Sequence, residues 1–458
     1  MAAAHWRASF NFGSRQRDLL AHAGALLQIG AGDRAKRILG DLRPRQLSDV
    51  RDAMIATEMC LDVHLLDQAW ASIERAGELD SEHAEVAQLR AECRYWLDQP
   101  AILQTEGQAI RGALDRVNAL ASGHSEAADR HVHIVGNLDS IGGSERRALN
   151  LRRLLAARMP ATLWTTVPAH AEHAKECAIR LISPEDAPVG GTLVLIGTYY
   201  ECGDWLERGR FERIVVCHNL VEQNQSLLRC LQRIERNAAH PRVQLTFPSK
   251  LFRDLLGLPG AIEYSPVDLT HFQRRRTQDN TRFTVGRHGR AYIWKYHAND
   301  SAFFRAMLAR GYGVRILGGS VIAHLFAHDT GAKPELIEAG TLDARDFLDS
   351  LDVFVYRKHP QFFETGGSVI LEAMAMELPV VAFPEQCGCA ELIVHGENGF
   401  LVHSEAEAFA IIERLRANQN LRQRIGVAAR QTLIDLWRRQ EPALLDFYGG
   451  ERESAAEH

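Results

Sequence analysis

The sequence has no uninterrupted apolar run of the ~20 residues that a membrane-spanning helix needs. The N-terminal stretch MAAAHWRASFNFGSRQRD also has no apolar core of the kind found in signal peptides. The eight cysteines are scattered, and the close pair Cys387 and Cys389 has the spacing of neither a zinc ribbon nor a thioredoxin-type motif. We therefore expect a cytoplasmic protein with reduced thiols, and contact with the inner face of the membrane stays open.

A strong charge imbalance is missing as well. The formal net charge of −5 provides no electrostatic case for nucleic acid as a partner. The apolar content of 46% and the charged content of 24% are typical of a globular protein, which argues against extended disorder. With 458 residues the chain is too long for one core, and its length predicts about three domains.

Residues 1–125 are predicted to form a helical domain, because apolar residues recur at helical spacing from Ser14 to Gln108. A weak repeat aligns Ala35 with Ala69, and 69 − 35 = 34 residues is the period of the tetratricopeptide unit. An irregular helical bundle is the alternative. Either arrangement suits docking of a protein partner or self-association, and neither carries catalysis.

After the polar connector ASGHSEAADR, apolar strands alternate with helices, which predicts parallel sheets covered on both faces. We expect an α/β fold with two doubly wound Rossmann-like domains, at residues 131–266 and 267–450. Ligands in such domains bind at the carboxyl ends of the strands, so a cleft between the domains is the natural site. The expected strands are His131–Val135, Thr162–Thr166, Thr192–Ile196, Arg213–Cys217, Gln244–Phe247, Phe283–Gly286, Val314–Leu317, Leu336–Ile337, Val353–Tyr356 and Val380–Ala382.

One stretch, FFETGGSVILEAM, combines two glutamates with a glycine pair. Glu364 ends a loop, and Gly366 and Gly367 allow the backbone to approach a ligand closely. The pattern predicts a helix from Ser368 to Met376 that carries Glu372 one turn in. Amides at a helix N-terminus suit a phosphate, and carboxylates accept strong hydrogen bonds from vicinal hydroxyls. A nucleotide-sugar offers both groups, so we interpret this stretch as a nucleotide-sugar site.

Three cations follow the first strand of the second predicted sheet. We expect Arg287, Arg290 and Lys295 to lie in one loop that opens onto the same strand ends as Glu364. Such a loop would neutralise a diphosphate leaving group. A solvated basic loop is the alternative.

Two further features belong to the first α/β domain. The pair Gly142-Gly143 opens a helix after the first strand and is either a cradle of amides for a phosphate or sugar, or a tight turn. His218 follows the strand that ends at Cys217, at the position where chemistry occurs in this fold class, and a structural capping histidine is the alternative.

Two runs of basic residues have less specific interpretations. The helix after Gly143 is expected to present its arginines on a solvated face, with an anionic lipid acceptor or a membrane surface as the alternative. A second run just before Glu364 either reaches the cleft or is solvated. The residues concerned are Arg146, Arg147, Arg152 and Arg153 in the first run, and Arg357, Lys358 and His359 in the second.

Together these motifs resemble the retaining glycosyltransferases of the GT-B fold, in particular the E-x7-E class that is family 4-like and described as glycosyl transferases group 1. The signature is Glu364-TGGSVIL-Glu372, followed by AMAMELPVVA and AELIVHGENGFLV. The segments IGGSERRALNLRRLL, YSPVDLTHF and VGRHGRAYIWK resemble the family's glycine-rich loop, interdomain linker and phosphate loop. The resemblance spans His131 to Phe447 and leaves out the N-terminal helices.

The resemblance implies a role for each matching residue. Glu364 would hold hydroxyls of the donor sugar and Glu372 the ribose. The remaining donor contacts would come from amides at Thr365, Gly366, Gly367 and Ser368, from Arg287 or Arg290 together with Lys295 at the diphosphate, from Gly143 at the phosphates and from His218 near the reacting carbon.

The implied activity is a metal-independent, retaining transfer of a sugar from a nucleotide-sugar, with a UDP- or GDP-sugar favoured and with no cofactor. The acceptor would be a glycan, a lipid-linked acceptor or a protein, in synthesis of bacterial surface polysaccharide or glycoconjugate. An epimerase or phosphorylase on the same fold, and an inactive binding scaffold, are the alternatives. Three departures limit the resemblance: Glu377 stands where the family commonly has glycine, Ser265-Pro266 replaces an Asn-Gly pair, and the domain at 131–266 is short.

Overall fold

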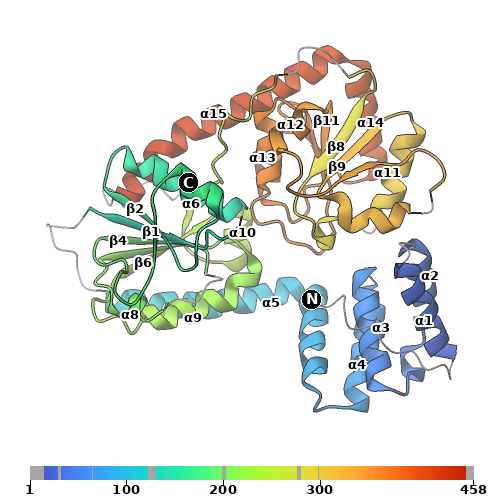
Figure 1. The fold of residues 1–458 in the computed structure, drawn as a ribbon, viewed down its shortest axis with the longest axis horizontal. Helices are drawn as coiled ribbons and strands as arrows, with labels where there is room; N and C mark the ends of the chain where they lie inside the picture. Colours follow the sequence, from blue (N-terminus) through green and yellow to red (C-terminus); the bar gives the residue numbers. More distant parts are fainter. Residues whose placement is uncertain are drawn as a thin grey trace.

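The computed structural model describes residues 15–28, 32–63, 65–121, 130–140, 142–198, 203–275, 280–297, 299–327 and 329–449. Most of the connector that we expected at residues 121–130 lies outside these ranges. The chain forms a helical N-terminal region followed by two α/β domains (Figure 1). None of the described helices is long and apolar enough to cross a membrane.

The N-terminal region is helical, as the apolar periodicity predicts. Small side chains at the helix contacts are fully buried, among them Ala35, Ala53 and Ala69, so the helices approach closely. Helix α1 packs on α2, and α3 packs on α4, while the 34-residue repeat stays a prediction. The elements are α1 (Arg15–Gln28), α2 (Gly32–Gly40), the 3-10 turn η3 (Pro44–Gln46), α3 (Val50–Asp62), α4 (Leu66–Leu79) and α5 (Ala84–Leu120).

Helix α5 is shared between the helical region and the first α/β domain. It has 37 residues and is kinked at Asp98, two residues before Pro100. Proline has no backbone N–H to donate and disfavours a helical conformation in the residue before it, so a straight helix is disfavoured here. Before the kink, Leu89 and Trp96 are buried in the core of the helical region. After the kink, the buried side chains of α5 belong to the core of the first sheet; they are Leu103, Ile110, Ala113, Leu114 and Val117.

Two glycines of α5 provide a matched test of this packing. A Cβ on Gly107 would lie 2.1 Å from the carbonyl oxygen of Leu256, whereas a Cβ on Gly112 would meet nothing closer than 3.8 Å. Gly107→Ala is therefore expected to lower the free energy of unfolding by about 1–3 kcal/mol. Gly112→Ala is expected to raise it by up to about 1 kcal/mol, because alanine favours the helix. Urea denaturation checks both, and equal effects would contradict this packing.

The first α/β domain contains a parallel seven-stranded sheet in the order β3-β2-β1-β4-β5-β6-β7. Its strands are β1 (Val132–Gly136), β2 (Ala161–Thr165), β3 (Ile179–Leu181), β4 (Thr192–Ile196), β5 (Arg213–Cys217), β6 (Arg242–Phe247) and β7 (Ala261–Ile262). Its helical elements are α6 (Gly143–Ala156), α7 (Ala171–Glu176), α8 (Trp205–Arg208), η4 (Val221–Gln223), α9 (Asn224–Ile234) and α10 (Lys250–Leu256).

The second α/β domain contains a parallel six-stranded sheet in the order β10-β9-β8-β11-β12-β13. Its strands are β8 (Thr284–His288), β9 (Gly313–Leu317), β10 (Glu335–Ile337), β11 (Val353–Tyr356), β12 (Val380–Ala382) and β13 (Phe400–Leu401). Its helical elements are η5 (Ile293–Lys295), α11 (Asp300–Ala309), η6 (Gly319–Phe326), α12 (Ala344–Asp349), α13 (Ser368–Ala375), η7 (Gly388–Leu392), α14 (Glu405–Ala417) and α15 (Gln419–Gly449).

The two Rossmann-like domains and the N-terminal helices confirm the predicted fold class. All ten expected strands are present, with ends shifted by two residues or fewer. The sequence reading missed three strands, β3, β7 and β13, which have only two or three residues each. Strands this short show no alternation of apolar and polar residues, and all three lie at the edges of their sheets.

The last helix connects the two α/β domains. Helix α15 begins in the second domain and reaches back over the first (Figure 1). Near its end, Leu444 and Tyr448 are buried in the core of the first domain beside β1 and β4. The Tyr448 hydroxyl donates a hydrogen bond of 2.6 Å to Glu263. The C-terminal helix thus fixes the second domain to the first.

The turn after α13 keeps a conformation that favours glycine, although a glutamate occupies it. Glu377 has a φ of 56°, in the left-handed region. A Cβ on Gly426 of α15 would lie 2.0 Å from the Glu377 carbonyl oxygen, so the turn and this helix are in close contact. Glu377 therefore occupies a backbone conformation that glycine adopts more readily.

Candidate active site

The segment with the glycine pair forms a turn that leads into α13, as predicted. Gly367 is the N-cap residue and has a φ of 74°, which a residue with a side chain rarely adopts. The backbone before it is fixed on both sides: the Glu364 N–H donates to Gln386, and the Glu364 carbonyl accepts from Gly388 at 2.8 Å. The first amides of α13 therefore have a defined direction.

Glu364 lies at the centre of a buried polar cluster. Its side chain is 9% exposed and accepts hydrogen bonds from Lys295 Nζ at 2.8 Å and from the Tyr356 hydroxyl at 2.5 Å. Burial by itself would raise the pKa of Glu364, but the charge and hydrogen bond of Lys295 and the bond from Tyr356 hold it below its ordinary value. Glu364 is thus an ionised hydrogen-bond acceptor, with Lys295 as its counter-ion.

Arg287 is placed differently from the sequence expectation. It lies inside strand β8, not in the loop after it, and its side chain is fully buried. The guanidinium lies over the rings of Tyr296 and Tyr356, donates one bond to the Arg357 carbonyl and approaches Asp300 at 4.0 Å. Its Nε and Nη2 have no hydrogen-bond partner among the described residues. The expected loop placement was wrong because β8 continues two residues beyond the predicted end.

Arg290 reaches the first α/β domain. A Cβ on Gly142 would lie 2.8 Å from Nη2 of Arg290, so this exposed arginine touches the start of α6. A Cβ on Gly143 would lie 3.9 Å from Ser368 Oγ at the start of α13. The N-termini of two helices from different domains therefore face the same region, as the sequence suggested. Arg287 and Arg290 both stay candidates for the phosphate.

Glu372 projects from α13 next to a histidine that the sequence reading missed. Its Oε2 lies 3.1 Å from Nε2 of His288, the last residue of β8, and its side chain is 23% exposed. The ring of His288 packs edge-on against Phe354, which fixes its orientation. The only sequence signal for His288 was its place at a strand end.

His218 follows β5, as predicted, but it is fully buried in this structure. Its ring lies 5.1 Å from the ring of Phe252, and its Nε2 lies 2.7 Å from Oδ1 of Asn224. Burial lowers the pKa of His218 to about 4, so the imidazole is neutral at pH 7. His218 can therefore act as a hydrogen-bonding group but not as a cation.

Thr365 joins the two α/β domains. Its hydroxyl donates to the carbonyl of Asn219, directly after His218, and its own carbonyl accepts a bond from Ser249, both at 2.5 Å. A Cβ on the next residue, Gly366, would lie 3.3 Å from Pro248. The loop between Glu364 and α13 is therefore pressed against the first domain, and the domain contact itself shapes this loop.

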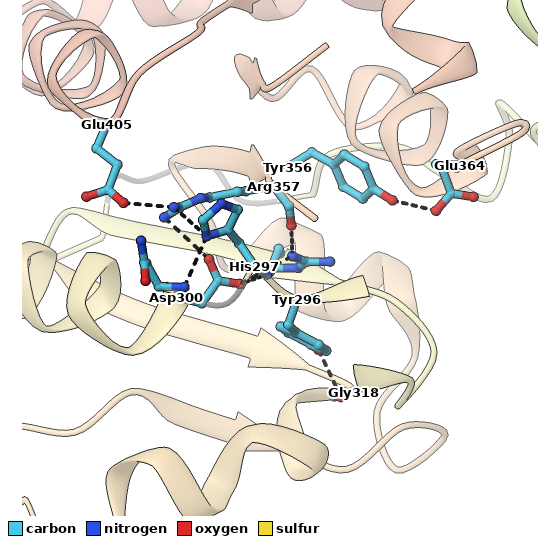
Figure 2. A network of polar contacts seen from close by, with 10 residues as sticks. Tyr296, His297, Asp300, Gly318, Tyr356, Arg357, Glu364 and Glu405 are labelled. Carbon is cyan, nitrogen blue, oxygen red and sulfur yellow. Dashed lines mark hydrogen bonds and ion pairs between the residues drawn. The ribbon is translucent and has the colours of Figure 1, made fainter. Parts of the chain in front are cut away.

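A second buried network lies beside Glu364 at the end of β11. Arg357 pairs with Asp300 of α11 at 3.5 Å and with Glu405 of α14 at 2.8 Å, and it contacts His297 (Figure 2). Burial raises the pKa of Asp300 to about 6 and lowers that of His297 to about 4. Arg357 is thus a structural cation that ties two helices to the strand end, not a solvated one.

Lys358 is also buried, which the sequence reading left open. Its Nζ donates a long bond of 3.3 Å to the His359 carbonyl, and burial lowers its pKa to about 8. The charge of Glu364 acts against this lowering, which places Lys358 as a second cation near that carboxylate. The site therefore holds more positive charge than the predicted loop alone.

Arg147 contradicts the prediction that the arginines of α6 form a solvated face. It is 2% exposed and pairs with the equally buried Glu263 at 2.9 Å, and it donates a further bond to Asn219. Arg146, its neighbour, is exposed and pairs with Glu176 on the surface at 2.7 Å. Helix α6 turns Arg147 inward because successive residues lie about 100° apart around a helix.

Comparison with known proteins finds a family match over the segment that holds Glu364 and Glu372. Residues 324–432 match the family model described as glycosyl transferases group 1. The match spans less than a quarter of the 458 residues. The matched range includes Glu364, the glycine pair and Glu372, but neither Lys295 nor His218. No curated protein matches the sequence.

Solved structures of similar fold cover most of the chain. Alr3699/HepE from Anabaena, solved with UDP and glucose, is 16% identical and has a TM-score of 0.50, with 70% of this chain and 98% of that chain covered. A glycosyltransferase from Rickettsia africae is 12% identical with a TM-score of 0.52, covering 70% and 99%. Sucrose-phosphate synthase from Thermosynechococcus elongatus is 14% identical with a TM-score of 0.51, covering 70% and 98%. At such identities the likeness establishes the fold, and the family match at residues 324–432 supports a glycosyltransferase.

Proposed function

We propose that this protein is a retaining glycosyltransferase that moves a sugar from a UDP- or GDP-sugar to a glycan, a lipid-linked acceptor or a protein. The observation that carries the proposal is the placement of Glu364 and Glu372 on either side of the α13 N-terminus, with Lys295 bound to Glu364. Carboxylates and helix amides in one place fit a ligand that has both hydroxyls and phosphates.

The diphosphate is the part of the donor that needs positive charge. Arg287 supports this role, because two of its donors are buried without a partner among the described residues, and an unused buried donor is costly. Lys295 is the second cation, and the amides that begin at Ser368 are the third source of positive potential. In the proposed reaction these groups stabilise the charge that develops on the departing diphosphate.

The sugar is the part of the donor that needs acceptors. We assign its hydroxyls to Glu364 and the ribose hydroxyls to Glu372, which lies 23% exposed beside His288. In the proposed mechanism the acceptor hydroxyl attacks from the face that the diphosphate leaves, and a diphosphate oxygen takes its proton. No protein nucleophile is required, and His218, being neutral, would contribute a hydrogen bond near the reacting carbon.

A thermal-shift screen of UDP-glucose, GDP-mannose, ADP-glucose and CMP-sialic acid tests donor binding. A ligand that binds only the native state stabilises it in proportion to RT ln(1 + [L]/Kd), so a donor at about 100 times its Kd contributes about 2.7 kcal/mol. We expect the UDP- or the GDP-sugar to raise Tm by a few degrees and the Glu372→Ala variant to lose this shift. No shift with any of the four, or an unchanged shift in the variant, would contradict the proposal.

A further inference from the structure

Three consecutive residues before the glycine pair enter three different parts of the molecule. Phe362 is buried in the core of the N-terminal helical region, and Phe363 is buried in the core of the first α/β domain. Glu364, next in the chain, binds Lys295 in the second domain. The position of Glu364 therefore depends on all three parts of the chain, including helices that lie outside the two-sheet fold.

Helix α5 contacts the loop that carries Lys295. Trp96 stacks on Trp294, the residue before Lys295, with ring centroids 3.8 Å apart and planes 11° from parallel. Both indoles are 5% exposed. Trp294 is further held by the edge of the His359 ring, and its carbonyl accepts a bond from the His359 N–H. A stacked, desolvated aromatic pair restricts the loop that carries Lys295.

The same helix contacts the support of His218 on the other side of its kink. Glu106 accepts a bond of 2.7 Å from Nδ2 of Asn224 and a bond of 2.8 Å from Gln225. Because its Nδ2 donates to Glu106, Asn224 must turn Oδ1 toward His218, which lies 2.7 Å away. An amide oxygen only accepts, so Nε2 of His218 carries the proton and Nδ1 keeps its lone pair. Glu106 thus determines the tautomer of the imidazole.

We propose that α5 is a positioning element of the donor site, in which Trp96 fixes the Lys295 loop and Glu106 fixes His218. The two contacts come from opposite sides of the Asp98 kink in one helix, which runs from the helical region along the first α/β domain (Figure 1). This inference rests on the proposed function. Trp96 and Glu106 are positioning residues, because each acts through another side chain.

The first arm of the test measures initial rates of donor turnover with UDP-glucose or GDP-mannose, whichever stabilises the protein, for Trp96→Ala, Trp96→Phe and Trp70→Ala. We expect Trp96→Ala to raise the donor KM roughly tenfold. Trp96→Phe should have a donor KM close to that of the parent, since a phenyl ring keeps part of the stack. Trp70 packs against the same helical core from α4 and is the matched control. Trp70→Ala should lower Tm but leave kcat/KM per folded molecule unchanged.

The second arm uses Glu106→Ala, Glu106→Gln and the neighbouring exposed control Thr105→Ala. We expect Glu106→Ala to lower kcat roughly tenfold with the donor KM within threefold, and Glu106→Gln to recover it, because one acceptor oxygen remains. This arm decides the matter if Trp96→Ala does not fold. Donor turnover by the parent chain tests the proposed function. The ratio of each variant's kinetic constants to those of the parent tests the role of α5. The inference would be overturned if Trp96→Ala changed the donor KM no more than Trp70→Ala does, and Glu106→Ala changed kcat no more than Thr105→Ala does.

Discussion

Lys295→Ala is expected to lower kcat/KM for the nucleotide-sugar by about 10²–10³-fold, the effect of removing one preorganised charge from a developing anion. Lys295 is the cation in direct contact with Glu364, at 2.8 Å. Its removal also leaves that buried carboxylate without its direct ion pair, so the substitution should impair donor binding as well as the chemical step.

The matched control for this variant is Lys333→Ala, in which an exposed lysine of the same domain is removed. Steady-state kinetics should place Lys333→Ala within about twofold of the parent, because an isolated surface charge contributes little. Glu372→Ala should show a loss dominated by the donor KM, since Glu372 is assigned to the ribose and not to the leaving group. A Lys295→Ala enzyme within a few-fold of the parent would contradict the assigned role.

Arg147→Ala is expected to lower the free energy of unfolding by about 3–5 kcal/mol, because it leaves the buried Glu263 carboxylate unpaired. Both partners are 2% exposed; Arg147 Nε donates to one carboxylate oxygen of Glu263 at 3.2 Å, and Nη2 lies 2.9 Å from the other. Burial by itself would lower the pKa of Arg147, but Glu263 holds it above the ordinary value, so Arg147 stays charged. Tyr448 of α15 donates to the same carboxylate, so the substitution also weakens the anchoring of the C-terminal helix.

The adjacent residue supplies the control for Arg147. Arg146→Ala removes an exposed arginine and its surface ion pair with Glu176, and urea denaturation should show a change of no more than about 1 kcal/mol. The double variant Arg147→Met with Glu263→Gln should recover at least half of the loss, because no charge is then buried without a partner. Equal losses for Arg147→Ala and Arg146→Ala would show that the buried pair has no special importance.

The parts of the site that lie on one continuous segment could be predicted from the sequence. The helix expected from Ser368, the turn at Gly367 and the separation of Glu364 from Glu372 are local features, set by glycine and by helical periodicity. The same holds for the ten expected strands, whose apolar residues could be recognised in the sequence. The roles of these residues in binding a donor stay predictions.

Features that depend on contacts distant in the chain could not be predicted. Arg147 resembles its solvated neighbours in the sequence, and only the position of Glu263 more than a hundred residues later explains its burial. His288 matters because β8 lies beside α13, and Trp96 matters because α5 passes the Lys295 loop. Pairings of this kind arise from packing, which periodicity and composition do not encode.

The measurement that tests the central claim most directly is proton NMR of the parent chain incubated with the stabilising nucleotide-sugar and a glycan, lipid-linked or peptide acceptor. We predict a new glycosidic product whose anomeric proton has the same configuration as that of the donor, together with release of the nucleoside diphosphate. An inverted anomeric configuration would contradict the retaining mechanism. A donor that is epimerised without an acceptor, or that stays unchanged with each acceptor class, would contradict the assignment as a glycosyltransferase.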